Sequence, residues 1–452
     1  FRRVLFRSEQ VVWQDLNNPS RNTPTPHARQ VSTTDTALKR VLIVTPSFWP
    51  SVGGVERVVE LIGLGLISRG YEVEVAAHPH PSRVGGSYQG MSVVSLADHD
   101  QFRDETPVSA IQVEALLASG RFDACLLIGA PTNGLFYGAL TPRLPKHTRL
   151  LLQPTMNQEI YQDLSKHAFI RPLFVQLAKQ ADAVIALAET GFDARFLREE
   201  QIPFLYVPNG TVRQSSATAF REKYRISAET FLILHVANLY PVKNHPGLLK
   251  ALAPIPPGAK LVIIGHSTHE TAYVQKVKQA LRDYPDVIHL EGLSPDEVGA
   301  AMSAADLLVL SSHAEASPLC ILEAMSHRLP WLATPECGTV TELAGGIVAP
   351  LQDFRQHILQ LMRTRGLGRA LGEMGQAHWN ACHQWSDVFQ GWMDLIETGQ
   401  LRRSYRMPDA IRKAMEDLTA QMTDPKRSNE HRQEPELVPR SVARTTAAGS
   451  SQ

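Results

Sequence analysis

The sequence predicts an α/β protein made of two doubly wound domains. Two series of short, continuously apolar segments alternate with stretches of helical spacing, and a Pro-Asn-Gly turn at 208–210 separates the two series. Strands of a parallel sheet buried on both faces have this apolar character, and their alternation with helices is typical of βαβ units. At 452 residues the chain is also too long for a single hydrophobic core.

The first domain is predicted over residues 39–205. It opens with a strand, KRVLIVTP, a loop, SFWPSVGG, a helix closed by Gly70, and a second strand, YEVEVAAH. This order forms a right-handed βαβ unit at the start of a doubly wound sheet. Further buried strands are expected at FDACLLIG (122–129), RLLLQPT (149–155) and ADAVIALA (181–188). The segment PFLYVPNGT (203–211) is predicted to be the hinge, because its Pro-Asn-Gly turn interrupts both periodicities.

The second domain is predicted over residues 206–384 and repeats the alternation. Its expected strands are TFLILHVAN (230–238), AKLVIIG (259–265), DVIHLEG (286–292), ADLLVLSS (305–312) and PWLATPE (330–336). The two ends of the chain have a different composition. Residues 1–38 are polar and aperiodic and are predicted to be a disordered tail, and FRRVLFRS, which begins with Phe rather than Met, is left out of the fold prediction. Residues 406–452 are predicted to be a polar, largely disordered tail with one helix within 406–422.

Composition excludes several classes of protein. The formal net charge is zero, so no global basic field indicates nucleic-acid binding. The four cysteines have neither CxxC spacing nor the density of a disulfide framework, which suits a reducing cytoplasm. No apolar run approaches the roughly 20 residues needed to span a bilayer, and no signal-peptide pattern is found.

The stretch SSHAEASPLCILEAMSHRLP (311–330) contains the strongest indication of a ligand site. The preceding strand delivers its loop to the crevice where α/β sheets bind ligands. Ser317 is predicted to cap the following helix, with Pro318 at its first position, so that the helix directs free amides into the crevice and favours an anion. Glu315 lies before this helix and Glu323 in its second turn. A ligand with a phosphate centre and hydroxyl groups at both ends, such as a nucleotide sugar, satisfies all these features.

The spacing Glu315-x7-Glu323, with Ala324-Met325 and Pro330 behind it, resembles the signature of family 4 glycosyltransferases, the group 1 enzymes of the GT-B fold. The segments SVGGVERVVELIGLGLISRGYEV, ADAVIALAE, VPNG, VANLYPVKNHPGLLKAL and WSDV agree with that family in consistent order over roughly residues 40–398. The resemblance implies two Rossmann-like domains facing each other across a cleft. The first would bind the acceptor and the second the nucleotide sugar, with a helix in 385–405 crossing back to the first domain. It implies no cofactor beyond the nucleotide-sugar co-substrate.

The same resemblance implies roles for individual residues. Glu315 would face the donor sugar, Glu323 the ribose, and Lys243 would neutralise the diphosphate as a point charge. The alternative for Lys243 is an ordinary solvated loop lysine. The other donor-site candidates are Asn238, where relatives often have arginine, Gly53, Gly54, Gly265, His266, Ser317, Pro318, Leu319 and Cys320. The two adjacent glycines allow close backbone approach, although a flexible loop would also explain them.

The acceptor side departs from the family. Relatives have a histidine after the strand RLLLQPT, where this chain offers Gln153, Thr155 and Asn157; Glu56 and Arg57 complete the acceptor-side candidates. Amides and hydroxyls orient a sugar but do not act as general bases near neutral pH. A retaining transferase tolerates this, because the departing phosphate oxygen takes the acceptor proton. The alternatives are a nucleotide-sugar epimerase of the same fold and a catalytically weak sugar-nucleotide binding protein.

Two further segments could indicate a metal site or a membrane contact. The tripeptide DHD (98–100) could be a metal-binding DxD, but such tripeptides arise often by chance, and no metal is predicted. The segment KHAFIRPLFVQLAKQ (166–180) resembles a basic amphipathic helix. A core-facing helix with solvated lysines is favoured, and peripheral contact with the inner face of the membrane is the alternative, because relatives act on lipid-linked glycans. The predicted partners are thus a nucleotide sugar and a glycan or lipid-linked acceptor.

Overall fold

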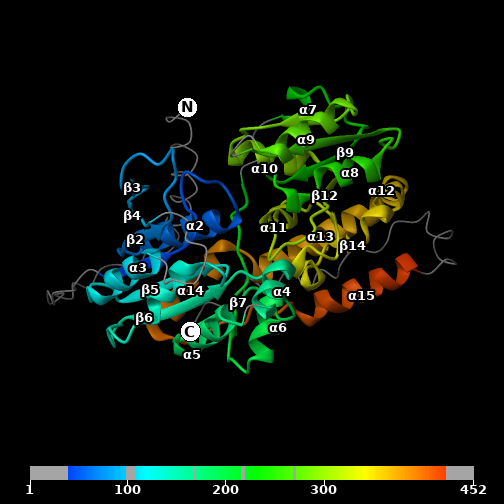
Figure 1. Ribbon diagram of the computed structural model, residues 1–452. Coiled ribbons are helices and arrows are strands. Elements are labelled where there is room, and N and C mark those ends of the chain that lie inside the picture. Colours follow the sequence, from blue (N-terminus) through cyan, green and yellow to red (C-terminus); the bar gives the residue numbers. More distant parts are fainter. Residues whose placement is uncertain (1–38, 98–107, 167, 215–218, 268–270, 424–452) are drawn as a thin grey trace, which may run out of the picture.

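The computed structural model describes residues 39–97, 108–166, 168–214, 219–267 and 271–423. They form two α/β units, each with a mostly parallel sheet that has apolar clusters on both faces (Figure 1). The prediction of two doubly wound domains is therefore confirmed. Of the tails predicted to be disordered, 1–38 and 406–452, residues 1–38 and 424–452 lie outside the described residues.

The first sheet has the strand order β3-β4-β2-β1-β5-β6-β7-β8. All neighbouring pairs are parallel except β3 with β4. The strands are β1 (Arg40–Val44), β2 (Glu72–Ala77), β3 (Ser87–Tyr88), β4 (Met91–Ser95), β5 (Ala124–Gly129), β6 (Arg149–Pro154), β7 (Ala183–Ala186) and β8 (Leu205–Tyr206). Since β8 pairs with β7, the first sheet extends across the predicted boundary at 205 to Tyr206.

Helices cover both faces of this sheet. Side chains of α2 and α14 share one core cluster, and those of α3, η1, α5 and α6 share the other. The bounds are α2 (Gly54–Ser68), α3 (Val108–Ala118), the 3-10 helix η1 (Gly134–Ala139), α4 (Gln158–Lys166), α5 (Ile170–Gln180), α6 (Phe192–Glu199) and α14 (Trp385–Thr398). On α5, Ile170, Phe174 and Leu177 are buried, which matches the core-facing interpretation of this segment.

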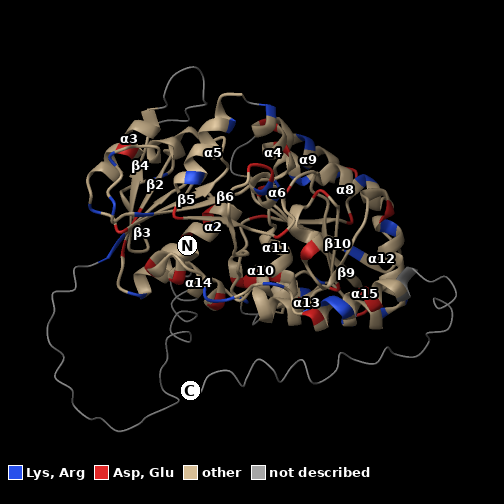
Figure 2. Cartoon of the chain, turned by 90° about the horizontal axis from the view of Figure 1, so that it is seen from below, with Lys and Arg blue, Asp and Glu red and all other residues tan. Residues whose placement is uncertain are grey.

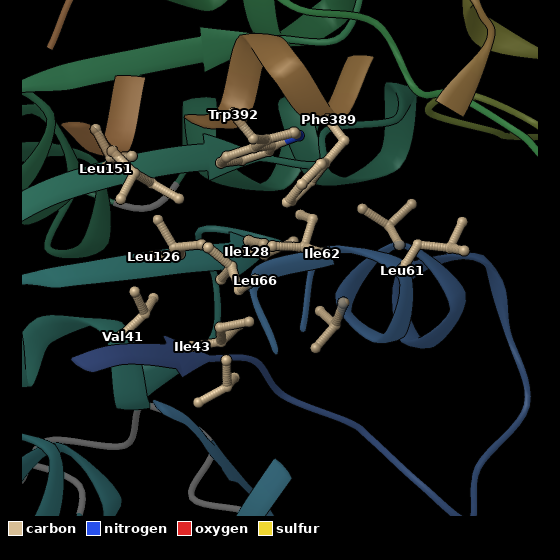
Figure 3. Close-up of a cluster of buried hydrophobic side chains, with 14 of the residues drawn as sticks. Val41, Ile43, Leu61, Ile62, Leu66, Leu126, Ile128, Leu151, Phe389 and Trp392 are labelled. Atoms are coloured by element: carbon tan, nitrogen blue, oxygen red, sulfur yellow. The ribbon is translucent and has the colours of Figure 1, made fainter. Parts of the chain in front are cut away.

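The core between α2, α14 and the sheet joins parts of the chain that are far apart in sequence. Ile62 and Leu66 of α2 meet Leu126 and Leu151 of the strands, and Phe389 and Trp392 of α14 close the cluster (Figure 3). Trp392 is only 1% exposed. The helix that follows the second unit is therefore an integral part of the first.

The second sheet has the order β11-β10-β9-β12-β13-β14, and every neighbouring pair is parallel. Its strands are β9 (Phe231–Val236), β10 (Ala259–Ile264), β11 (Ile288–Leu290), β12 (Leu307–Leu310), β13 (Trp331–Ala333) and β14 (Gly346–Val348). The helical elements around it are α7 (Phe220–Lys223), η2 (Pro241–Lys243), α8 (His245–Leu252), α9 (Ala272–Arg282), α10 (Pro295–Ala304), α11 (Leu319–Ser326), η3 (Gly338–Glu342), η4 (Leu351–Asp353), α12 (Phe354–Arg363) and α13 (Arg365–Cys382).

One prediction for the start of α11 is wrong. The sequence predicts Ser317 as the helix cap and Pro318 as the first helical residue. In the structure, Pro318 occupies the cap position with an extended ψ of 110°, and the helix begins at Leu319. The Pro318 carbonyl accepts the first bond of the turn, from the Ile321 amide at 3.2 Å. No side chain caps the helix, so the hydroxyl of Ser317 is not used for this purpose.

The two units are connected at a hinge where the chain crosses twice. The amide of Thr211 donates to the carbonyl of His383 at 3.0 Å, and the amide of Trp385 donates to the carbonyl of Thr211 at 3.1 Å. The indole of Trp379 donates to the Thr211 hydroxyl at 2.8 Å. The predicted hinge segment is thus held to the start of α14 by backbone hydrogen bonds.

A second contact between the units lies on the loop after β7. The carboxylate of Glu342, on η3, accepts the backbone amides of Glu189 at 2.8 Å and Thr190 at 2.5 Å. Arg406 forms an ion pair with Glu189 at 2.9 Å. Beside these residues is a cavity of about 820 Å³, which is also lined by the helix α15 (Asp409–Thr423). This helix matches the one expected within the C-terminal tail.

Charges on the described residues are distributed without segregation. Acidic and basic residues are interspersed along the helices in Figure 2, and the formal net charge is zero. No helix in the described part of the chain is both long and apolar enough to cross a membrane.

Candidate active site

The candidate site lies where the carboxyl ends of β9 and β12 in the second sheet meet the loop after β1 in the first. The amino ends of α2 and α11 approach each other here: a Cβ placed on Gly54 would lie 3.9 Å from Cδ1 of Leu319. Amides at the first turn of a helix have no partner within the helix, and the helix dipole makes this end positive. Two helix ends therefore direct positive potential toward the same space, which suits an anionic ligand.

Lys243 and Glu315 form an ion pair at the centre of the site. The Lys243 ammonium contacts Oε1 of Glu315, and their side chains are 21% and 12% exposed. Burial alone would lower the pKa of Lys243, but the Glu315 carboxylate outweighs burial and holds the pKa above its ordinary value. The two residues predicted to be catalytic are thus brought together, with the lysine charged.

The loop that carries Glu315 is fixed by close packing. Its amide donates to the carbonyl of Glu336 at 3.1 Å. Gly338 has a φ of 69°, and a Cβ there would lie 2.2 Å from the carbonyl oxygen of Glu315. Only glycine fits such a contact at such a φ, so the loop after β13 supports the loop after β12 through Gly338.

Glu323 has an unusual environment for a carboxylate. It is partly buried, and among the described residues its side chain has no hydrogen-bond or ion-pair partner. Burial raises its pKa to about 7, against an opposing effect of Arg57 from the first unit. A desolvated carboxylate without a partner is costly unless a ligand supplies hydrogen-bond donors. Glu323 is therefore suited to bind ligand hydroxyls.

Asn238 contacts the first unit directly. Its Nδ2 donates to the carbonyl of Val52 at 2.7 Å, immediately before the glycine pair. At Gly53, a Cβ would lie 2.4 Å from Oε2 of Glu56, so the Glu56 carboxyl folds back over this glycine. The amide of Asn238 is thus engaged across the interface in this arrangement.

The remaining donor-side candidates differ in exposure. A Cβ on Gly265 would lie 2.2 Å from the carbonyl oxygen of Ala237, which explains this glycine by packing alone. His266 is exposed and its carbonyl accepts the Leu239 amide at 3.0 Å. Ser317 and Cys320 are partly exposed beside Glu315, and burial raises the pKa of the Cys320 thiol.

Three of the acceptor-side candidates, Gln153, Thr155 and Asn157, lie at or after the carboxyl end of β6, and Glu56 and Arg57 lie on α2. Gln153 is 1% exposed and its Oε1 has no hydrogen-bond partner in the described part of the chain. The Asn157 side chain accepts the Ile160 amide at 2.9 Å and thus caps α4, while the Thr155 amide donates to the Gly129 carbonyl at 3.2 Å. Arg57, from α2, donates to Glu60 at 2.6 Å. Strand β5 separates β6 from β1 in the sheet, so Gln153, Thr155 and Asn157 are two strands away from the loop after β1.

Ser311 and Ser312, which the sequence did not indicate as site residues, contact the ion-pair residues. The Ser312 hydroxyl donates to Oε1 of Glu315 at 2.7 Å, and the Ser311 hydroxyl donates to the carbonyl of Lys243 at 3.0 Å. Two polar residues directly after the apolar run LLVL were the available signal. Among the described residues, no group of three or more His, Cys, Asp or Glu could hold a metal ion. Asp98 and Asp100 lie outside the described residues.

In sequence and in fold the chain is similar to group 1 glycosyltransferases. Residues 216–375 match the family described as glycosyl transferases group 1, and this range contains Asn238, Lys243, Glu315 and Glu323. The chain is also similar to N-acetyl-alpha-D-glucosaminyl L-malate synthase of Bacillus anthracis, at 22% identity over 72% of this chain and 88% of the relative. The prediction of a glycosyltransferase is confirmed.

Solved structures confirm the GT-B fold. Sucrose-phosphate synthase of Thermosynechococcus elongatus superimposes with a TM-score of 0.66 at 16% identity, covering 79% of this chain and 98% of that chain. HepE of Anabaena, solved in complex with UDP and glucose, gives a TM-score of 0.63 at 17% identity, covering 80% and 100%. None of the relatives named here is an epimerase, so the comparisons give that alternative no support.

The environment of Glu323 predicts an effect of pH on stability. Because its pKa is near 7 in the folded protein and 4.5 is the ordinary value, the folded protein keeps a proton that the unfolded chain releases. Stability is therefore lost as pH rises from about 4.5 to about 7. We expect Glu323→Gln to be more stable than the wild type at pH 8 by up to about 3 kcal/mol, and equally stable near pH 4.5.

Thermal and urea unfolding at the two pH values measure this difference. Glu336→Gln is the matched control, because Glu336 is an exposed carboxylate of the same unit and its replacement should change stability little at either pH. Equal stability of the Glu323→Gln variant and the wild type at pH 8 would contradict a desolvated Glu323.

Proposed function

We propose that this glycosyltransferase moves a sugar from a nucleotide-sugar donor to a glycan or lipid-linked acceptor, with retention of configuration and without a metal. The observation that carries the proposal is the half-buried pair of Lys243 and Glu315 at the amino end of α11. A cation and a helix end suit a diphosphate, while a carboxylate beside them suits the transferring sugar. The complexes of HepE with UDP and with UDP-glucose support a uridine nucleotide as the first donor to test.

In the proposed reaction, the bond between the anomeric carbon and the diphosphate oxygen breaks as the acceptor oxygen bonds to the same face of that carbon. The acceptor proton passes to the departing phosphate oxygen, so no separate base is required. Lys243 and the amides at the start of α11 stabilise the negative charge on the diphosphate. Glu315 holds sugar hydroxyls and favours the positive charge at the anomeric carbon. Glu323, whose side chain has no hydrogen-bond partner among the described residues, accepts hydrogen bonds from the hydroxyls of the ribose.

The surroundings of the site support a retaining mechanism. An inverting transferase needs a base on the face opposite the leaving group. The candidates at and after the end of β6 are the amides of Gln153 and Asn157 and the hydroxyl of Thr155, none of which is basic near neutral pH. For the acceptor we infer a role for Arg57 and Glu56, which lie on the first unit facing α11.

The acceptor class also bears on where the protein works. We place it in the cytoplasm, where nucleotide sugars would be available, with peripheral contact at the inner face of the membrane when the acceptor is lipid-linked. Support comes from Phe169, which is 64% exposed, with Lys166 and Arg171 nearby in sequence. An apolar tip with basic neighbours is typical of interfacial contact.

Donor consumption tests the function as a whole. Ligand-detected NMR against a panel of nucleotide sugars selects the donor, and product formation is then followed with and without candidate acceptors. A transferase should consume the donor at an appreciable rate only when acceptor is present. Donor isomerisation without acceptor would instead establish an epimerase, and binding without turnover under both conditions would favour a binding protein.

Substitutions at the ion pair separate its two roles. Glu315→Gln should lower turnover by about 100-fold while leaving UDP affinity within about twofold, because UDP lacks the sugar that Glu315 contacts. Lys243→Ala should lower turnover and also weaken UDP, since the diphosphate loses its cation. Calorimetry and steady-state kinetics measure both effects, with the exposed Lys250→Ala on α8 as the control. If Glu315→Gln weakened UDP binding as strongly as Lys243→Ala, Glu315 would be part of the phosphate site and not of the sugar site.

Chelation tests the absence of a metal requirement. Lys243 and the amino end of α11 supply positive charge to the diphosphate, so activity should persist in excess EDTA. The initial rate before and after dialysis against EDTA is the measurement. A rate that fell on chelation and returned with magnesium or manganese would refute this part of the proposal and return Asp98 and Asp100 to consideration.

A further inference from the structure

Two adjacent serines at the end of β12 are fully buried. Ser311 is 0% exposed and Ser312 is 1% exposed, directly after the apolar strand residues Leu307–Leu310. Buried hydroxyl groups are unfavourable unless they are hydrogen-bonded. Their partners therefore indicate why two polar residues occupy this position.

The Ser311 hydroxyl supports the segment that carries Lys243. It donates to the Lys243 carbonyl at 3.0 Å and lies 3.5 Å from the carbonyl oxygen of Asn244. Asn244 follows η2 and has a left-handed backbone conformation, with a φ of 55°. The amide of His313 adds a bond of 2.7 Å to the Val242 carbonyl. The backbone beneath the lysine is thus anchored to the end of β12, and Ser311 is the side chain that anchors it.

The Ser312 hydroxyl supports Glu315 instead. It donates to Oε1 at 2.7 Å, and the same oxygen receives the Lys243 ammonium. The other oxygen, Oε2, has no partner among the described residues and is free for a ligand hydroxyl. The Ser312 carbonyl accepts the Thr334 hydroxyl at 2.7 Å, which fixes the serine from behind.

We propose that Ser311 and Ser312 are positioning residues with separate tasks: Ser311 sets the phosphate-binding lysine, and Ser312 sets the sugar-facing carboxylate. Consecutive side chains of an extended chain point to opposite sides, so adjacent residues reach two different loops. When a diphosphate engages the Lys243 ammonium, the neutral Ser312 hydroxyl still holds Oε1 and leaves Oε2 directed at the sugar. This inference rests on the proposed function, because it assigns the two tasks to the two ends of a nucleotide sugar.

The separate tasks predict different kinetic effects. Ser312→Ala should lower kcat about tenfold, with KM for the donor and affinity for UDP within about twofold, because only the sugar-facing carboxylate loses a hydrogen bond. Ser311→Ala should weaken UDP and raise KM for the donor by about three- to tenfold, because the lysine backbone is released. Ser312→Cys keeps the volume and a weak donor and should recover part of kcat. UDP calorimetry and steady-state kinetics on the full chain supply these values.

Controls separate positioning from a general loss of stability. Thr148→Val removes another buried hydroxyl, which donates to the carbonyl of Phe122 at 2.7 Å. Thr148 lies at the amino end of β6, whereas the candidate site lies at the carboxyl ends of the strands. The Thr148→Val variant should lower thermal stability as much as the serine variants while leaving kcat and UDP affinity unchanged. Two serine variants with the same kinetic defect, or with none, would overturn the division of tasks. A wild-type chain that consumes no nucleotide sugar would overturn the proposed function itself, which is a different outcome.

Discussion

The ion pair between Lys243 and Glu315 is the interaction on which the candidate site depends. It joins the loop after β9 to the loop after β12, and both side chains are largely withdrawn from water. Removing one member of such a pair leaves the other charge buried and unpaired, which is far more unfavourable than losing an exposed salt bridge. The surrounding structure keeps the two charges paired. Buried hydroxyls, a close glycine contact and backbone hydrogen bonds all fix the two loops that the ion pair connects.

The sequence predicted the architecture well because burial on both faces leaves a strong pattern. Continuous apolar runs located β1, β5, β9 and β12, and each lies within the range that was expected. Short edge strands such as β14 (Gly346–Val348) and β8 (Leu205–Tyr206) were missed, since two or three residues give too short a pattern. The E-x7-E spacing located Glu315 and Glu323 because both belong to one local strand-loop-helix segment.

Contacts between distant segments could not be predicted in this way. Nothing in the local sequence of Asn238 indicates that its amide donates to Val52 of the other unit. The same holds for Glu342 and the amides of the loop after β7. The cap of α11 was misassigned because serine before proline satisfies the local rule, whereas the path of the loop across Gly338 decides where the helix begins. The contacts of these individual side chains could therefore be identified only from the tertiary structure.

The placement of α14 has a consequence for biosynthesis. The first sheet is complete once Tyr206 has been made, yet the face that packs on Phe389 and Trp392 stays uncovered until the whole second unit has followed. During translation the nascent amino-terminal half would expose the apolar surface of β5 and β6 while the remaining chain emerges. Exposed apolar surface on a partly made chain favours aggregation and recruits chaperones. The two halves of this enzyme are thus separate in space, yet the first is completed only by helix α14, which is synthesised after the whole second unit.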